Sequence, residues 1–116
     1  MLKRFTKTVR LPIRKNPIRV AFSLEKYYNG NTAIMVHRPT LFGYDQRGTI
    51  TLSTNTKLPE GCACIDTNHH GQEIADWLQM LDFAEPMGFC NFHGAYQCPL
   101  FKFDLEKMQQ YCIPSA

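Results

Sequence analysis

The 116-residue sequence lacks the short motifs that mark nucleotide-binding, zinc-protease and serine-hydrolase sites. It contains no GxGxxG, GxxxxGK, HExxH or GxSxG pattern. No apolar run approaches the roughly 18 residues that a membrane-spanning helix needs, and the N-terminus lacks the apolar stretch of a secretory signal. We therefore expect a cytoplasmic, non-enzymatic protein that needs no cofactor and is not held in a membrane.

Acidic residues are missing from residues 1–19, which carry seven lysines and arginines. Residues 20–116 hold the other six basic residues and all ten acidic ones, so the net charge is +7 on the first segment and −4 on the rest. Pro12 and Pro17 discourage helix in the first segment. We interpret residues 1–19 as a basic N-terminal arm or an edge strand, and residues 20–116 as a single α+β domain.

The cysteines follow no recognised ligand or disulfide spacing. Five cysteines are an odd number in a chain large enough to fold without crosslinks, which predicts reduced thiols. Soft ligands for zinc are present as Cys62, Cys64, His69, His70, Cys90, His93 and Cys98. Their spacing argues against zinc, because a C-x-C pair cannot make the knuckle of a C-x-x-C pair. No hydrolase signature accompanies the possible Cys–His pairs, Cys90 with His93 and Cys64 with His69, so we predict no metal and no catalytic residue.

The sequence does contain one stretch in which a turn, a strand, a helix cap and a helix follow without interruption, Lys57–Leu81. Pro59-Glu60-Gly61 predicts the turn and Cys62-Ala63-Cys64-Ile65 a short buried strand. Asp66-Thr67-Asn68 predicts a helix cap. The helix that follows has an apolar stripe at helical spacing, formed by Ile74, Trp77, Leu78 and Leu81. We expect the Trp77 ring to pack on a sheet and its indole N–H to reach a partner near the rim.

The remaining segments read mostly as strands joined by turns. Ile18–Tyr28 and Thr32–His37 predict a hairpin around Asn29-Gly30-Asn31. The later segments are a loop over Arg38–Gly48, a strand over Thr49–Thr54, a glycine-bounded segment over Met87–Ala95, a strand over Tyr96–Asp104 and a short helix over Leu105–Ile113. The sequence thus predicts a mainly antiparallel sheet of four to six strands with one main amphipathic helix packed on one face.

Charge and exposed aromatic residues indicate where a partner would bind. The predicted contact residues are the basic side chains of the arm and two aromatic residues of the loop: Arg4, Lys7, Arg10, Arg14, Lys15, Arg19, Phe42 and Tyr44. They favour a partner protein, because the acidic body would repel a phosphate backbone, and nucleic acid is the alternative. An unpaired edge strand would also allow a homodimer. The acid pairs Asp82/Glu85 and Asp104/Glu106 are spaced like solvated surface and are assigned no role.

Four segments carry a family resemblance: Tyr28-Asn29-Gly30-Asn31-Thr32-Ala33-Ile34, Leu58-Pro59-Glu60-Gly61-Cys62-Ala63-Cys64-Ile65-Asp66-Thr67-Asn68, Phe83-Ala84-Glu85-Pro86 and Tyr96-Gln97-Cys98-Pro99-Leu100-Phe101-Lys102-Phe103-Asp104-Leu105-Glu106-Lys107-Met108. They resemble an uncharacterised family of small bacterial proteins encoded on conjugative elements and phages of gut Firmicutes. The resemblance spans roughly Val20–Met108 and carries no catalytic residues. It implies an accessory protein of a mobile element that binds a host protein, of which anti-defence inhibitors are one class.

Overall fold

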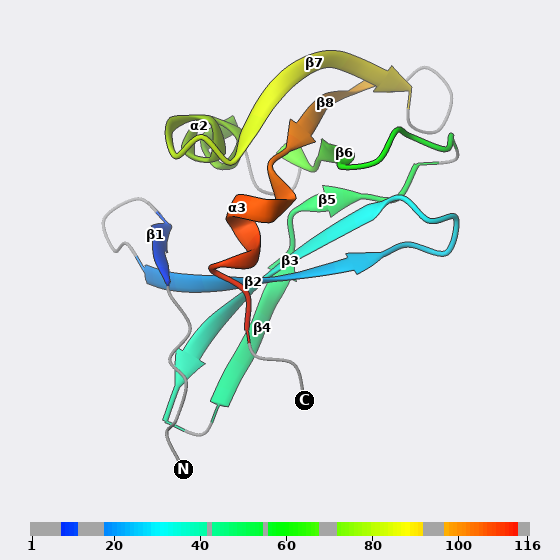
Figure 1. Ribbon diagram of the computed structural model, residues 1–116. Helices are drawn as coiled ribbons and strands as arrows, with labels where there is room; N and C mark the ends of the chain where they lie inside the picture. Colours follow the sequence, from blue (N-terminus) through cyan, green and yellow to red (C-terminus); the bar gives the residue numbers. More distant parts are fainter. Residues whose placement is uncertain are drawn as a thin grey trace.

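The computed structural model describes residues 8–11, 18–41, 43–54, 56–67, 72–91 and 97–113. These residues form two four-stranded antiparallel sheets and two short helices (Figure 1). The first sheet has the strand order β1 (Val9–Leu11), β2 (Ile18–Lys26), β3 (Thr32–Thr40) and β4 (Gly43–Thr49). The second sheet has the order β5 (Thr51–Leu52), β6 (Cys62–Ile65), β8 (Gln97–Phe103) and β7 (Ala84–Asn91). The helices are α2 (Gln72–Met80) and α3 (Leu105–Gln109).

The chain crosses from the first sheet to the second at Ile50, which lies between β4 and β5. Its N–H donates to the Ile34 carbonyl at 2.9 Å, and its carbonyl accepts from the Asp66 N–H at 2.9 Å. Because this one residue bonds to both sheets, the predicted strand Thr49–Thr54 is divided in two. The expected single sheet of four to six strands is therefore wrong in number, while the mainly antiparallel pairing and the α+β class are confirmed.

The predicted hairpin around Asn29-Gly30-Asn31 is confirmed, since β2 pairs with β3 in the register that places Lys26 opposite Thr32. The prediction of a loop over Arg38–Gly48 is wrong, because β3 continues to Thr40 and turns back into β4. Pro39 is tolerated in this strand because β2 pairs with β3 only as far as His37. The missing N–H of Pro39 therefore interrupts no hydrogen bond between strands.

Strand β7 occupies much of the segment that the sequence presents as glycine-bounded and irregular. The Phe83 carbonyl accepts from the Asp104 N–H at 2.8 Å, so residues at the alternate positions, Pro86 among them, direct their backbone groups away from β8. The missing N–H of Pro86 faces the open edge and costs no ladder bond. Pairing with β8 then shifts between Pro86 and Gly88, where Gly88 takes a φ of 121°. Pro86 at the sheet edge and Gly88 at the bulge therefore make this strand look like an irregular segment in the sequence.

The central stretch follows its sequence pattern closely. The Cys62 N–H donates to the Pro59 carbonyl at 3.0 Å and closes the turn, with Gly61 at a φ of 82°. Strand β6 covers the predicted four residues, all of them buried. The predicted cap at residues 66–68 lies partly outside the described residues. The stripe is mostly buried, but α2 has nine residues and α3 five, so the expected one main helix is replaced by two short ones.

Trp77 ties the core to the first strand. Its ring centroid lies 6.1 Å from that of Phe22, and its indole N–H donates to the Arg10 carbonyl of β1 at 2.5 Å. The predicted packing on a sheet and the predicted partner near the rim are both confirmed. Because β1 is only three residues long, this hydrogen bond adds a fixed point to a strand that pairing alone holds weakly.

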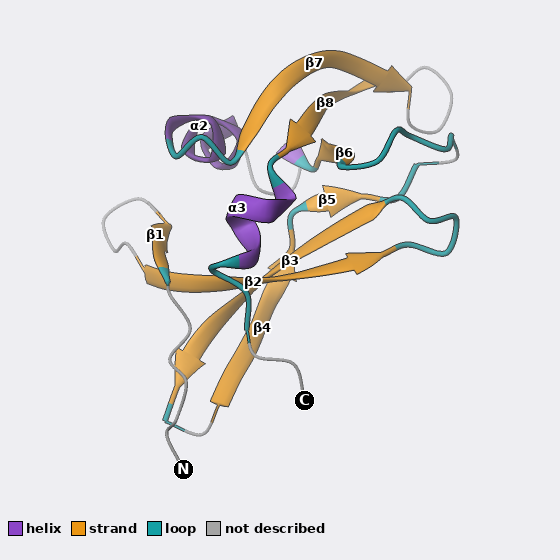
Figure 2. Ribbon diagram, in the orientation of Figure 1, coloured by secondary structure: helices purple, strands orange, loops and turns teal. Residues whose placement is uncertain are grey.

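The core is built from facing aromatic residues of both halves of the molecule. Phe83 contacts Phe22 and Tyr111 edge to face, with ring centroids 5.6 and 5.4 Å apart. The C-terminal segment also extends the first sheet, since the Phe22 N–H donates to the Tyr111 carbonyl and the Ile113 N–H to the Phe22 carbonyl, both at 2.8 Å. In Figure 2, helix α3 lies between the second sheet and β2. The two sheets therefore share one core.

Candidate functional site

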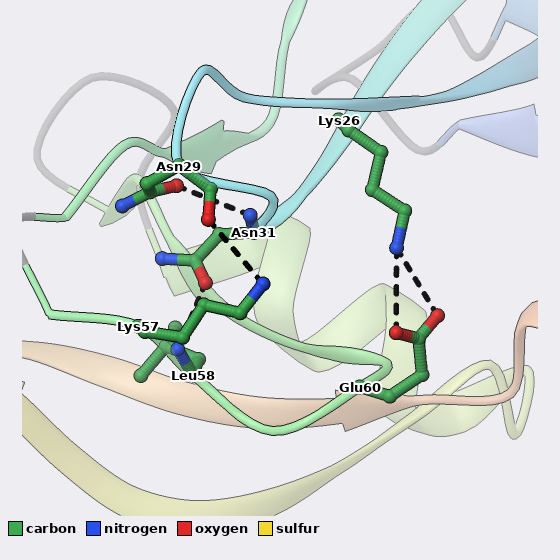
Figure 3. A network of polar contacts seen from close by, with 6 residues as sticks. All are labelled: Lys26, Asn29, Asn31, Lys57, Leu58 and Glu60. Carbon is green, nitrogen blue, oxygen red and sulfur yellow. Dashed lines mark hydrogen bonds and ion pairs between the residues drawn. The ribbon is translucent and has the colours of Figure 1, made fainter.

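A buried polar network joins the β2–β3 turn to the loop before β6 (Figure 3). The Asn31 side-chain oxygen accepts from the Leu58 N–H at 2.8 Å, and its amide donates to the Thr56 carbonyl at 2.8 Å and the Thr54 hydroxyl at 3.2 Å. Asn29 closes the turn by accepting from the Asn31 N–H at 3.1 Å. Asn31 is 3% exposed and uses both amide hydrogens and its oxygen. The network therefore holds the fold together rather than presenting groups to a ligand.

Tyr27 extends this network toward β5. Its hydroxyl donates to the Thr51 carbonyl at 3.0 Å and lies 3.0 Å from the Thr51 hydroxyl oxygen, which accepts from the Ile34 N–H at 3.1 Å. Burial raises the pKa of Tyr27, so the side chain stays a neutral hydroxyl. The Asn-Gly-Asn turn is thus fixed from both sides. Its polar residues are explained by folding.

An open groove of about 600 Å³ lies beside the network, where the turn before β6, the start of β7 and the end of β8 meet. Its apolar lining includes the edges of Phe83 and Phe103, which are otherwise buried. Its charged lining consists of one basic residue, Lys102, and five acidic ones, Glu60, Asp82, Glu85, Asp104 and Glu106. Half of the ten acidic residues in the chain therefore surround one groove.

Strand pairing brings these acids together from distant parts of the sequence. Glu85 of β7 lies opposite Lys102 of β8, and Ala84 opposite Phe103. The Phe103 N–H donates to the Gly61 carbonyl at 2.8 Å, which places the turn carrying Glu60 against the same end of β8. Helix α3 begins directly after β8, so the acids of its first turn reach the same opening. The acidic residues meet because of the register in which the strands pair, so their spacing in the sequence does not reveal the groove.

Three of the five carboxylates in the groove are exposed without a neutralising partner. Asp104 caps α3, since its side chain accepts from the Lys107 N–H at 3.0 Å, and Glu60 forms an exposed ion pair with Lys26 at 3.2 Å. Within the part of the chain that the structure describes, no hydrogen bond or ion pair engages the carboxylates of Asp82, Glu85 and Glu106. Like charges gathered in this way produce a negative potential that attracts cationic groups.

Lysine side chains near the groove offset only part of this charge. Lys102 is exposed and lines the groove. Lys107 is held to one side, where its ammonium donates to the Leu81 carbonyl at 2.6 Å and lies 5.1 Å from the centroid of the Phe83 ring. With Lys26, which pairs with Glu60, three ammonium groups against five carboxylates leave the surroundings of the groove at a net charge of −2. A cationic ligand would reduce the repulsion that remains.

The structure brings two of the predicted partner-binding residues together. Arg10 of β1 and Arg19 of β2 lie directly opposite each other, and both are exposed. The Arg19 guanidinium donates to the Thr8 hydroxyl at 3.2 Å. Tyr44 is 37% exposed on β4, which β3 separates from β2, so it does not join the arginine pair. The other predicted residues, Arg4, Lys7, Arg14, Lys15 and Phe42, lie outside the described residues.

The structure describes only some of the residues on which the zinc and Cys–His hypotheses depend. Among the described residues, no group of three or more His, Cys, Asp or Glu side chains is arranged to hold a metal ion. The zinc and Cys–His hypotheses involve His69, His70 and His93, which lie outside the described residues, so both stay untested predictions. The structure adds a pair that sequence reasoning did not name, since the Ser23 hydroxyl lies 2.8 Å from His37 Nε2. Both side chains are buried, and desolvation lowers the pKa of His37, so the pair is interpreted as a packed polar contact.

The acidic groove is the feature that sequence reasoning missed. Asp82/Glu85 and Asp104/Glu106 look like ordinary surface when each pair is considered alone. A sequence signal was nevertheless available, because segments that carry the family resemblance contribute Glu60-Gly61, Phe83-Ala84-Glu85 and Lys102–Glu106 to one groove. The acidic residues that recur in these segments could have indicated a common acidic site.

In the part of the chain that the structure describes, two antiparallel sheets and two short helices surround one core and form a small α+β domain with an acidic groove. A family model described as a domain of unknown function, DUF4313, matches residues 21–115, and the chain belongs to that family. The match begins at Ala21 and therefore excludes β1 and all of the basic segment over residues 1–19. Neither the curated proteins nor the solved structures gave a match. No helix in the described part of the chain has the length and apolar character needed to cross a membrane.

Proposed function

We propose that this protein is a non-enzymatic interaction module, and that its acidic groove binds a lysine- or arginine-rich segment of a partner protein. The observation that carries the proposal is the gathering of five of ten acidic residues around one groove. Three of those carboxylates have no partner among the described residues. A basic segment would supply the missing cations, and the aliphatic stems of its side chains would cover the apolar floor.

The finer assignment comes from the family resemblance. We propose that the partner is a host protein, and that the module is an accessory protein of a conjugative element or phage, with inhibition of a host defence as one such role. What supports this is the family membership together with the interaction surface. A pull-down from the native host is the experiment that would name the partner.

The exposed pair Arg10 and Arg19 forms a second candidate binding surface. Arg10 and Arg19 are exposed cations placed directly opposite each other, an arrangement that destabilises a strand pair unless an anion relieves it. We propose that this pair contacts an acidic region of the same partner. A phosphate backbone is the alternative anion, but the acidic groove on the same body would repel it.

The groove is tested by titrating the protein into a fluorescent peptide of alternating lysine and leucine residues and measuring anisotropy. Replacing Asp82, Glu85 and Glu106 by their amides should weaken binding about tenfold to hundredfold, since exposed charge contacts contribute roughly 0.5–1 kcal/mol each. Affinity of the unmodified protein should also fall as salt rises. The matched control removes three exposed acids elsewhere, with Asp45→Asn, Glu73→Gln and Asp76→Asn. Equal weakening in both variants would show that net charge alone drives binding and would reject the groove.

The alternative anion is tested with oligonucleotides and the Arg10→Ala, Arg19→Ala variant. If the arginine pair contacts phosphates, oligonucleotide affinity should fall steeply with salt, and the variant should lower the slope by nearly one unit per lost contact. Under the protein hypothesis, oligonucleotide binding is weak and the variant changes it little. Tight, salt-dependent binding that depends on this pair would favour nucleic acid over protein as the partner.

A further inference from the structure

Four of the five cysteines lie on one face of the second sheet. Cys62 and Cys64 are two residues apart on β6, so they share a face. Cys90 of β7 lies directly opposite Cys98 of β8, and the register of β6 with β8 places Cys98 diagonally from Cys64 on that same face. None of these cysteines is in a disulfide. Three thiols, those of Cys64, Cys90 and Cys98, therefore converge from three neighbouring strands.

Contacts between these thiols are close. The Cys98 thiol donates to the Cys90 carbonyl at 3.6 Å. Burial and the nearby thiols of Cys98 and Cys90 raise the pKa of Cys64. Opposed residues in an antiparallel pair have Cα atoms about 4.5–5.5 Å apart, inside the range of about 4.4–6.8 Å over which a disulfide closes. Cys90 and Cys98 can therefore be bridged with little movement of the backbone.

The three thiols differ in access. Cys64 and Cys98 are fully buried, whereas Cys90 is half-buried. Desolvation raises the pKa of both Cys64 and Cys98, which keeps these thiols protonated at neutral pH. A water-borne oxidant would therefore meet Cys90 first.

We propose that Cys90 and Cys98 form a reversible thiol–disulfide site that responds to peroxide. Hydrogen peroxide oxidises the Cys90 thiol to a sulfenic acid and is itself reduced to one water. The Cys98 sulfur then attacks the Cys90 sulfur and displaces hydroxide, which takes the Cys98 proton and leaves as a second water. A dithiol reductant reverses the bond by exchange. The bridge joins β7 to β8 at the end of the hairpin far from Ala84 and Phe103, which line the groove, so this site is independent of the proposed peptide binding.

The test treats the full-length protein with hydrogen peroxide, blocks the remaining thiols with an alkylating agent and measures the intact mass. The expected result is the loss of two of the five alkylatable thiols, restored by dithiothreitol. Chymotrypsin cuts after Phe92 and Tyr96, so a bridge between Cys90 and Cys98 links two separate peptides. A bridge from Cys64, or over-oxidation of Cys90 with an unmodified Cys98, would overturn the assignment.

Variants assign the roles of the two residues. In Cys98→Ala the sulfenic acid on Cys90 has no thiol opposite it, so dimedone should label Cys90 in that variant and leave the unmodified protein largely unlabelled. Cys64→Ala should keep the bridge. If Cys98→Ala fails to fold, Cys90→Ala at the half-buried position should abolish the bridge without that complication. A bridge that persists in Cys90→Ala would contradict the proposal.

Discussion

The polar network at the β2–β3 turn and the acidic groove adjoin each other, yet they use polar side chains in opposite ways. In the network, Asn31 is buried and all of its hydrogen-bonding groups have partners. In the groove, the carboxylates of Asp82, Glu85 and Glu106 are exposed and have no partner among the described residues. Segments that carry the same family resemblance therefore serve two purposes. One set closes the fold, and the other leaves charge available for binding.

The largest expected effect is on the network side. Replacing Asn31 by alanine removes the acceptor for the Leu58 N–H and leaves this buried backbone group unsatisfied. It also removes the amide donor to the Thr56 carbonyl and the Thr54 hydroxyl, although that carbonyl still accepts from the Thr54 hydroxyl at 2.9 Å. The free energy of unfolding should fall by about 2–4 kcal/mol, measured by urea denaturation. Asn29→Ala removes a more exposed side chain and should cost about 1 kcal/mol. Equal costs for the two variants would show that burial of the network does not set its strength.

Asp104 belongs to both sides of the comparison, because it lines the groove and caps α3. Asp104→Ala should lower the free energy of unfolding by about 1 kcal/mol and also weaken binding of a basic peptide. Asp104→Asn keeps a capping oxygen but loses the charge, so it should preserve stability and weaken binding to the same extent. Thermal unfolding and anisotropy on the same samples separate the two roles. A stable Asp104→Asn variant with unchanged affinity would remove Asp104 from the binding site.

A pH titration of stability tests the buried contact between Ser23 and His37. Desolvation lowers the folded-state pKa of His37 below its ordinary value of 6.5, so the unfolded chain takes up a proton that the folded chain refuses. His37 therefore costs no stability above about pH 6.5 and reduces stability progressively as pH falls through 6.5 toward the lowered value. His37→Gln should flatten this part of the curve of unfolding free energy against pH. An unchanged slope would mean that His37 is not the group being titrated.

The smallest effect on stability is expected at the ion pair between the two regions. Lys26 and Glu60 are 3.2 Å apart with side chains 55% and 80% exposed, so Lys26→Gln should change the free energy of unfolding by less than about 0.5 kcal/mol. The same change frees Glu60 from its cation and should strengthen binding of a basic peptide. A weaker complex would show that Lys26 itself contacts the ligand.

Sequence reasoning succeeded where local pattern determines structure and failed where register does. The Asn29-Gly30-Asn31 turn, the strand Cys62–Ile65 and the contacts of Trp77 follow from spacing and turn chemistry, and all three are confirmed. Strands β4 and β7 were missed because Pro39 and Pro86 usually mark breaks. Here Pro39 lies beyond the last residue pair that joins β2 to β3, and Pro86 lies on the edge strand β7. Edge position is a property of the assembled sheet.

The groove was beyond local reasoning for the same reason. Glu60, Glu85 and Asp104 are far apart in the sequence, and only the pairing of β6, β7 and β8 places them around one opening. Register depends on the hydrophobic face of every strand at once, so charges that it gathers cannot be counted from spacing. The basic pair Arg10 and Arg19 was named in advance because both lie in a segment whose charge is evident from composition.

The most direct test of the account is an NMR titration of the labelled protein with the lysine–leucine peptide. Amide resonances of residues 82–85 and 102–106 should shift as the peptide is added, because these backbone segments line the groove. Resonances of Asn29–Asn31 should stay in place, because their polar groups are already engaged within the fold. Shifts centred on Asn29–Asn31, or on β1 and β2 with the groove unchanged, would contradict the claim that the acidic groove is the binding site.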